Sequence, residues 1–479
     1  MNYSIVRYII GWVLKFEAAF LCLPALVGIL YHEKDCITYF CVAVACLLVG
    51  LLLSCRKPSN RSLYTKEGFL IVALSWIIMS LFGALPFVLT GDIPSYVDAF
   101  FETVSGFTTT GASILSNVEA LSRTNLFWRS FTHWIGGMGV FVFIMAITPL
   151  LGGSTMTLMK AESPGPSVDK LVPRLRDTST ILYGIYIVLT LVEVLLLVLF
   201  DMPVFEAFCT SFGTTGTGGF GVKNDSIAGY SPAIQNIVTI FMILSGINYG
   251  MYFLLLRRKW KQAFTFEEVR WYLGIIAAAG CIIFFNIRHL FPTAGEGLRH
   301  TFFQIGSIIT TTGFASTDFN LWPQLSKTCL VLLMFIGACA GSTGGGIKVS
   351  RIMILVRTIR KELASIAHPQ QVSKVRMDGH AVGHETIRST NVFMVVYLIL
   401  MLLSVLLISI DGYDFTTNFT AVAATINNIG PGLELVGPTG NYAFFSEFSK
   451  IILSFNMLAG RLELFPLLVL LSPACWKKH

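Results

Sequence analysis

The hydrophobic positions of this chain fall into long runs separated by polar segments. Because lipid cannot satisfy exposed backbone groups, a run of about 20 mostly apolar residues is typical of a membrane-crossing helix. The candidate runs are residues 8–31, 37–54, 68–90, 126–149, 180–201, 232–256, 271–290, 326–350, 391–410 and 448–471. The pattern therefore predicts an all-α polytopic membrane protein with about ten transmembrane helices.

Four apolar stretches between these runs are too short to cross a membrane. They are residues 97–109, 203–215, 298–311 and 415–427. Stretches of about 10–14 apolar residues suggest re-entrant elements. Each stretch continues into a polar strip that contains glycine. The chain thus repeats one unit four times, a crossing helix, a short helix, a polar strip and a second crossing helix, and such internal repeats are a fold-level signal.

The polar strips align on a glycine that follows a phenylalanine by ten residues in the first three repeats. The pairs are Phe101 and Gly111, Phe208 and Gly218, and Phe303 and Gly313. In the fourth and most diverged strip, Phe419 precedes Gly430 by eleven residues. Additional glycines at 216, 219 and 221 leave open a register one residue away in the second strip.

Four such strips around a pseudo-fourfold axis would form a cation filter. A dehydrated cation needs oxygen ligands, and backbone carbonyls of an extended chain supply them. Glycine permits the backbone angles that turn a carbonyl inward, and threonine adds hydroxyl oxygens. The alternative, ordinary surface loops with glycine turns, does not explain four matched positions. The candidate filter residues are Thr109, Thr110, Gly111, Thr217, Gly218, Thr311, Thr312, Gly313, Asn428, Ile429 and Gly430.

Composition and charge fit this picture. The 479 residues are 54% hydrophobic and 13% charged, whereas soluble domains carry about 25% charged residues. The net charge of +7 lies in loops, and no basic soluble segment suggests nucleic-acid binding. Basic loops at 56–66, 160–176, 257–270 and 351–388 alternate with loops poor in Lys and Arg. The positive-inside rule makes the basic loops and both termini cytoplasmic.

The strips "SGFTTTGAS", "TSFGTTGTGGFG", "SIITTTGFAST" and "ATINNIGPGLELVGPTGNY", together with "GSTGGGIK" and "AGRLELFP", resemble the TrkH/TrkG/KtrB/HKT superfamily of potassium transporters. The helix pair at 8–54 resembles that of the TrkH branch. The resemblance implies K⁺ as the transported ion with no organic cofactor, a homodimer in the lipid of a bacterial inner membrane, and a cytosolic RCK/KTN-type nucleotide-binding regulatory subunit. The implied parts are an N-terminal hairpin at 1–60 and pore repeats at 61–165, 166–262, 263–372 and 373–479.

A glycine-rich segment interrupts the crossing run of the third repeat. Five glycines within residues 337–346 should break a helix, because each costs about 1 kcal/mol in a helix interior. One reading is a loose helix end; the resemblance implies a gating loop below the filter, with Arg461 facing the pore. The alternative for Arg461 is that it pairs with Glu463 or extends to the membrane interface. Lys348 could act in the gate as Arg461 does, or it could be the first positive anchor of the cytoplasmic loop that follows it. The candidate gate residues are Gly341, Ser342, Thr343, Gly344, Gly345, Gly346, Lys348 and Arg461.

Two transport mechanisms remain open at this stage. The first is a channel-like potassium pore gated by the cytosolic partner. The second is a secondary symporter that couples K⁺ to H⁺ or Na⁺, although such proteins usually contain two inverted halves. An enzyme is not expected, because no nucleophile, base and acid converge in the sequence. His133 is expected to pack between helices rather than bind a metal, and the role of Glu102 is undecided.

Overall fold

The computed structural model describes residues 2–58, 65–139, 175–370 and 374–476. The end of the predicted crossing 126–149 and nearly all of the basic loop 160–176 lie outside this part of the chain. In these residues the regular secondary structure is helical apart from one antiparallel pair of two-residue strands, β1 (Arg376–Met377) and β2 (His380–Ala381). The prediction of an all-α polytopic fold is confirmed.

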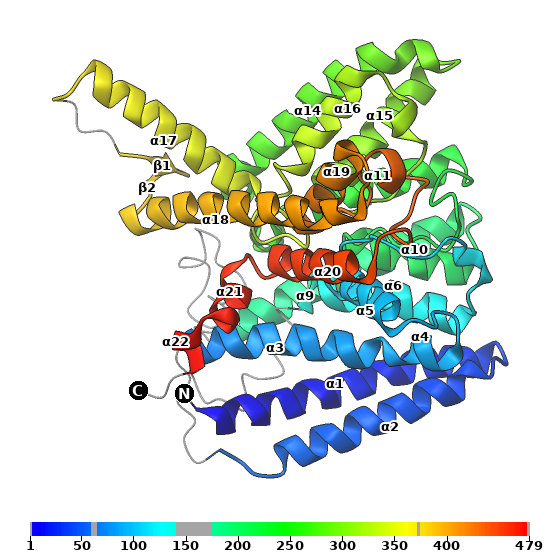
Figure 1. Ribbon diagram of the computed structural model, residues 1–479. Helices are drawn as coiled ribbons and strands as arrows, with labels where there is room; N and C mark the ends of the chain where they lie inside the picture. Colours follow the sequence, from blue (N-terminus) through cyan, green and yellow to red (C-terminus); the bar gives the residue numbers. More distant parts are fainter. Residues whose placement is uncertain (1, 59–64, 140–174, 371–373, 477–479) are drawn as a thin grey trace.

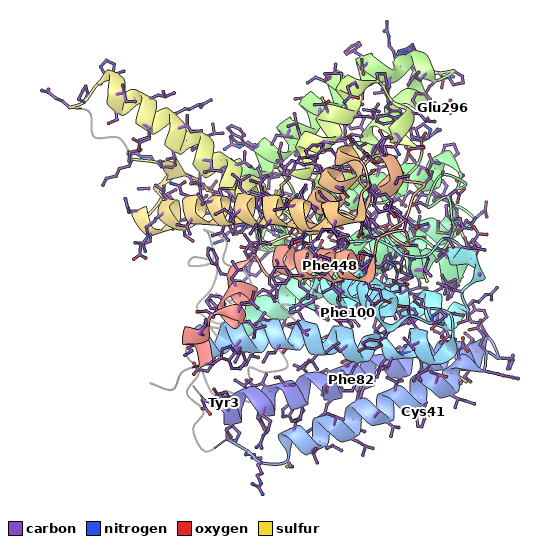
Figure 2. All side chains as sticks on the ribbon, in the orientation of Figure 1. Tyr3, Cys41, Phe82, Phe100, Glu296 and Phe448 are labelled. Carbon is purple, nitrogen blue, oxygen red and sulfur yellow. The ribbon has the colours of Figure 1, made fainter. Side chains whose placement is uncertain are left out.

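An N-terminal hairpin of α1 (Tyr3–Leu30) and α2 (Asp35–Ser54) lies at one edge of the molecule, beside the first helix of the first repeat (Figure 1). Leu52 of α2 is 72% exposed, and Cys41 points away from the helix bundle (Figure 2). Apolar side chains on this outer face suit contact with lipid, whose tails need no polar partner.

Each of the four repeats begins with a long helix and continues with a short one. The long helices are α3 (Thr65–Gly83), α9 (Leu175–Leu199), α14 (Glu267–Ile287) and α18 (His384–Ile408). The short helices are α5 (Tyr96–Phe107), α10 (Val204–Thr215), α15 (Ala294–Ile309) and α19 (Phe415–Ile426). A further short helix, α4 (Leu85–Thr90), extends α3. Helices α5, α10, α15 and α19 occupy the four predicted re-entrant stretches.

Each repeat also contains a second helix after its polar strip. These helices are α6 (Arg123–Gly137), α11 (Pro232–Ser245), α16 (Gln324–Met334) and α20 (Glu447–Arg461). The predicted crossing 232–256 bends by 90° between α11 and α12 (Tyr249–Leu256). The predicted crossing 448–471 breaks before α21 (Phe465–Leu471), where Glu463 and Leu464 adopt positive φ. The prediction of continuous helices was wrong for both.

The interruption predicted in the third repeat is present. Residues 335–348, here called the inner loop, separate α16 from α17 (Val349–Ala367). Helix α17 projects from the body at the side where α1 begins and α22 (Pro473–Trp476) ends (Figure 1). Within the described residues, six helices are long and apolar enough to cross a membrane, or seven when the bent pair counts as one.

The remaining elements are short. Helix α13 (Trp260–Phe264) follows α12, and 3-10 turns are formed by Val118–Ala120, Arg288–Leu290, Phe319–Leu321, Ser409–Asp411 and Glu434–Val436. The largest buried core surrounds α5 and α6 and includes Trp128 and Phe107, whose rings meet edge to face at 5.9 Å. This packing fixes the first short helix, and the strip that follows it, against the second helix of its own repeat.

Candidate functional site

The four polar strips leave their short helices through the same backbone turn. The second residue after each helix is left-handed, with φ between 54° and 60°; these residues are Thr109, Thr217, Thr311 and Asn428. The N–H of the next residue bonds back to the carbonyl five positions earlier, at 2.8–2.9 Å. A left-handed β-branched residue is strained. Three such threonines at matched positions indicate that the surrounding structure holds the turn, as is typical of functional sites.

Each strip places a glycine in the left-handed region two residues later. These glycines are Gly111, Gly219, Gly313 and Gly430, with φ of 77°, 79°, 86° and 96°. The left-handed glycine is therefore the one singled out from the sequence in three strips, whereas in the second strip it is Gly219 rather than Gly218. The alternative register left open by the sequence is the one observed.

The phenylalanine used for the alignment explains the error. Counted from the helix ends, Phe101 corresponds to Cys209, Phe303 and Thr420, and all four are buried. Phe208 lies one position earlier on α10 and is only partly buried. One residue turns a helix by about 100°, so Phe208 faces a different neighbour and does not mark the register. Phe419 is offset from Thr420 in the same way.

The four strips pack side by side in a closed ring. A Cβ on each glycine would overlap a carbonyl oxygen of the next strip in chain order. The overlaps are Gly111 with Gly218, Gly219 with Thr312, Gly313 with Ile429, and Gly430 with Thr110. Glycine is therefore required twice at these positions, for its positive φ and for the close approach of a neighbouring backbone. We call the strips, residues 108–111, 216–219, 310–313 and 427–430, the ring.

A hollow of about 120 Å³ opens on one side of the ring, and all four glycines line it. Its lining includes the cationic side chains Arg129 and Lys223. Arg129 Nε donates to Glu102 at 2.6 Å, and Lys223 lies 3.8 Å from Glu206. Because both cations face a carboxylate, their repulsion of an approaching cation is reduced.

Glu102 and His133 hold the ring rather than line it. The Glu102 carboxylate also accepts from the Ser113 hydroxyl and the Ile114 N–H, both at 2.9 Å, and so fixes the chain after the first strip. The His133 ring accepts from Phe220 N–H at 3.2 Å and therefore donates through Nδ1 to the Gly106 carbonyl at 2.7 Å. The expected packing role of His133 agrees with these contacts.

Arg461 lies against the other side of the ring. Its guanidinium donates to Thr109 Oγ1 at 3.3 Å in the first strip and to the Thr343 carbonyl at 2.8 Å in the inner loop. It also donates to the carbonyls of Gly136 and Gly137 at the end of α6, at 2.5 and 3.2 Å. Arg461 thus joins three parts of the site. Glu463, the alternative partner considered from the sequence, pairs instead with Arg351.

The inner loop contacts the ring from the same side as Arg461. Gly345 N–H donates to Thr311 Oγ1 at 2.7 Å. A Cβ on Gly344 would lie 2.9 Å from the Thr310 carbonyl, and one on Gly345 would lie 3.0 Å from the Asn427 carbonyl. The glycines therefore let the loop approach strips three and four more closely than a side chain would allow.

The other predicted gate residues occupy the edges of the loop. Lys348 Nζ bonds back to the Gly344 carbonyl, and Gly346 has a φ of 73°. The Gly341 carbonyl accepts from Tyr249 N–H at 3.0 Å, at the bend between α11 and α12. Ser342 is half-buried, and its hydroxyl donates to the Cys339 carbonyl at 2.7 Å. The structure thus brings residues 343–345 and Arg461 to the ring and leaves Ser342 away from it.

The sequence reasoning missed Gly219 as a ring residue and gave no role to Glu268 of α14. The extra glycines of the second strip were a signal for Gly219, because they left its register open. No local pattern pointed to Glu268, because it contacts residues more than 70 positions later in the chain.

Comparison with known proteins places the chain beside a family of transporters. The profile of the TrkH family, described as cation transport protein, matches residues 34–478. The chain is 37% identical to the Trk system potassium uptake protein TrkH of Salmonella typhimurium and 36% identical to that of Escherichia coli K12, over 100% of each chain. It matches the crystal structure of the potassium transporter TrkH from Vibrio parahaemolyticus with a TM-score of 0.89 and 32% identity, over 100% of both chains.

Proposed function

Because this chain belongs to the TrkH family of cation transport proteins, we propose that it carries potassium into a bacterial cell through the ring. Members of the family are transporters rather than enzymes. The protein is a multi-pass membrane protein, and we place it in the cytoplasmic membrane with both termini inside. The TrkH relatives named above are potassium uptake proteins, which supports the choice of ion.

The closed ring is the observation that carries this proposal. Each strip presents backbone carbonyls and a hydroxyl or amide side chain, and these neutral oxygens can replace the water shell of a monovalent cation. A membrane potential that is negative inside favours inward movement by about 2.3 kcal/mol per charge per 100 mV. In this proposal the filter strips are the candidate residues named from the sequence, with Gly219 added in the second repeat.

The inner loop and Arg461 form the gate in this proposal. The loop lies across one side of the ring, and the guanidinium adds a fixed positive charge there, which raises the barrier for cations. Gate opening requires the loop to withdraw, and glycines make that backbone change inexpensive. We propose that a cytosolic nucleotide-binding RCK/KTN-type subunit acts on the projecting helix α17 and that the protein works as a homodimer.

A K⁺/H⁺ or K⁺/Na⁺ symporter is the alternative mechanism. Symporters usually place the substrate between two inverted halves. Here four units follow one another in the same order and meet in a ring, which favours a channel-like pore.

The experiment is a flux assay on the purified full-length protein in liposomes. Potassium and rubidium uptake is measured against sodium, with the pH and sodium gradients set independently. Uptake that follows the potassium gradient alone supports the channel-like pore. Uptake that requires a proton or sodium gradient would establish the symporter instead. Liposomes that take up no potassium or rubidium under any gradient would refute the proposed function.

A further inference from the structure

Helix α17, which follows the inner loop, has no cap from its own sequence. The first N–H groups of a helix lack partners within it and need an acceptor from outside. The residue at the cap position, Lys348, has a φ of 75° and its side chain makes no capping bond. Val349 N–H bonds to the Ala338 carbonyl at 3.0 Å. Ser350 N–H bonds instead to Oε1 of Glu268, on α14, at 3.1 Å.

The same carboxylate oxygen holds the beginning of the loop. Glu268 Oε1 also accepts from Ala340 N–H at 2.7 Å. Ala340 precedes the glycines that approach the ring, and Ser350 follows them. One oxygen atom of a different helix therefore holds both ends of the segment 340–350 together. We call these two ends, Ala340 and Ser350, the neck of the loop; the glycine segment extends from the neck to the ring.

The burial of Glu268 shows that these bonds matter. Glu268 is 3% exposed, and a buried carboxylate is costly unless hydrogen bonds and charge compensate it. The two backbone N–H groups supply charge-assisted bonds, which are about twice as strong as neutral ones. The Lys348 ammonium adds favourable charge. Opening of the loop would leave this buried carboxyl without the backbone N–H groups of Ala340 and Ser350.

Glu267, the residue before Glu268, holds α17 at a second point along the helix. Glu267 pairs with Arg357 at 2.7 Å. Arg357 lies seven residues after Ser350, about two helical turns along α17. The first turn of α14 therefore holds α17 at two points, and Arg351 ties the same helix to Glu463 beyond the end of α20.

We propose that Glu268 is a positioning residue that latches the inner loop closed. The inference rests on the proposed function, in which the loop is the gate. Withdrawal of the loop from the ring moves Ala340 and Ser350 relative to α14, and one oxygen atom cannot follow both. Opening therefore breaks at least one of the two bonds, and these bonds favour the closed state.

The test uses three variants of the full-length protein in liposomes without any regulatory subunit. Glu268→Ala removes the acceptor, Glu268→Gln keeps an acceptor without the charge, and Glu268→Asp keeps the charge on a shorter side chain. We expect rubidium flux to rise at least about tenfold in Glu268→Ala, since the closed state loses both bonds to Glu268 and opening would have broken at least one of them. A smaller rise is expected for Glu268→Gln. Glu385→Gln, an exposed glutamate in the first turn of α18, is the matched control and should equal wild type.

Hydrogen exchange of the segment 338–352 provides a readout that does not depend on transport. We expect faster exchange at Ala340 and Ser350 in all three variants and unchanged exchange there in Glu385→Gln. Faster exchange with wild-type or reduced flux would overturn the latch, because the carboxylate would then only support the fold. Unchanged exchange would also overturn it. If Glu268→Ala does not fold, Glu268→Gln and Glu268→Asp decide. A wild-type protein without flux would refute the proposed function, while hydrogen exchange at Ala340 and Ser350 would still test whether Glu268 holds the inner loop.

Discussion

Replacement of Arg461 by alanine should increase potassium flux in the absence of a regulatory subunit. The guanidinium donates a hydrogen bond to the inner loop, at Thr343, and others to Thr109 and to the end of α6. A hydrogen bond from a charged group contributes about 1.5–3 kcal/mol. Loss of the bond to the loop should therefore raise the ratio of open to closed states roughly 10- to 100-fold.

A second substitution separates the bond from the charge. Arg461→Lys keeps a positive charge but loses the planar fork that reaches several carbonyls at once. We expect flux between those of wild type and Arg461→Ala, because the loop is released while the cation barrier persists. Rubidium uptake into liposomes measures both. Lys450→Gln is the control, since Lys450 is a buried cation of the same helix that pairs with Asp98 at 2.6 Å and touches neither loop nor ring strip. Wild-type or lower flux in a folded Arg461→Ala protein would refute the gate assignment.

Three further predictions follow from the described contacts. Gly313→Ser should reduce the preference for potassium over sodium in a competition flux assay, because the new side chain meets the Ile429 carbonyl of the next strip; Gly412→Ser has a similar positive φ with open space around it and should not. Glu102→Ala should lower the free energy of unfolding by about 3–5 kcal/mol, since Arg129 loses its buried partner, whereas Glu296→Ala, which breaks a partly exposed pair at 3.9 Å, should cost at most about 1 kcal/mol; equal melting temperatures for the two would contradict this. Asp414 caps α19, and its hydrogen bonds with Thr417 lower its pKa below the ordinary 3.8; the resulting stability is present above pH 3.8 and is lost as pH falls through the lower folded value. Asp414→Asn should keep the cap but lose this acid dependence, as thermal melts between pH 3 and pH 6 would reveal.

The repeats and the short helices could be predicted from the sequence because both depend on local pattern. Run length separates a crossing helix from a short one, and glycine after threonine marks the turn at each strip. Three of the four ring glycines followed from this pattern alone. The ring glycine of the second repeat, Gly219, did not, because Phe208 was used to align that strip. Equivalent helix positions are defined by the neighbours that they pack against, and Phe208 does not occupy the position that corresponds to Phe101 and Phe303.

The helix breaks and the contacts of the gate could not be predicted in the same way. The bend after Ser245 and the break at Glu463 and Leu464 lie in sequences apolar enough to be read as continuous helices. Arg461 was placed near the loop by resemblance, but its bonds to Thr109 and to α6 join residues more than 300 positions apart. Such contacts depend on how four repeats assemble, which no single segment encodes.

The closure of the ring has a consequence for how the protein is made. The ring closes between its first and last strips, where Gly430 meets the Thr110 carbonyl and Asn428 Nδ2 donates to Thr110 Oγ1 at 3.0 Å. A ribosome synthesises the first repeat early and the fourth last. A nascent chain with three repeats therefore has no complete ring. The repeat that completes the ring also brings Arg461. In the proposed function the growing chain therefore acquires its pore and the cation that closes it together, and no ungated pore forms during synthesis.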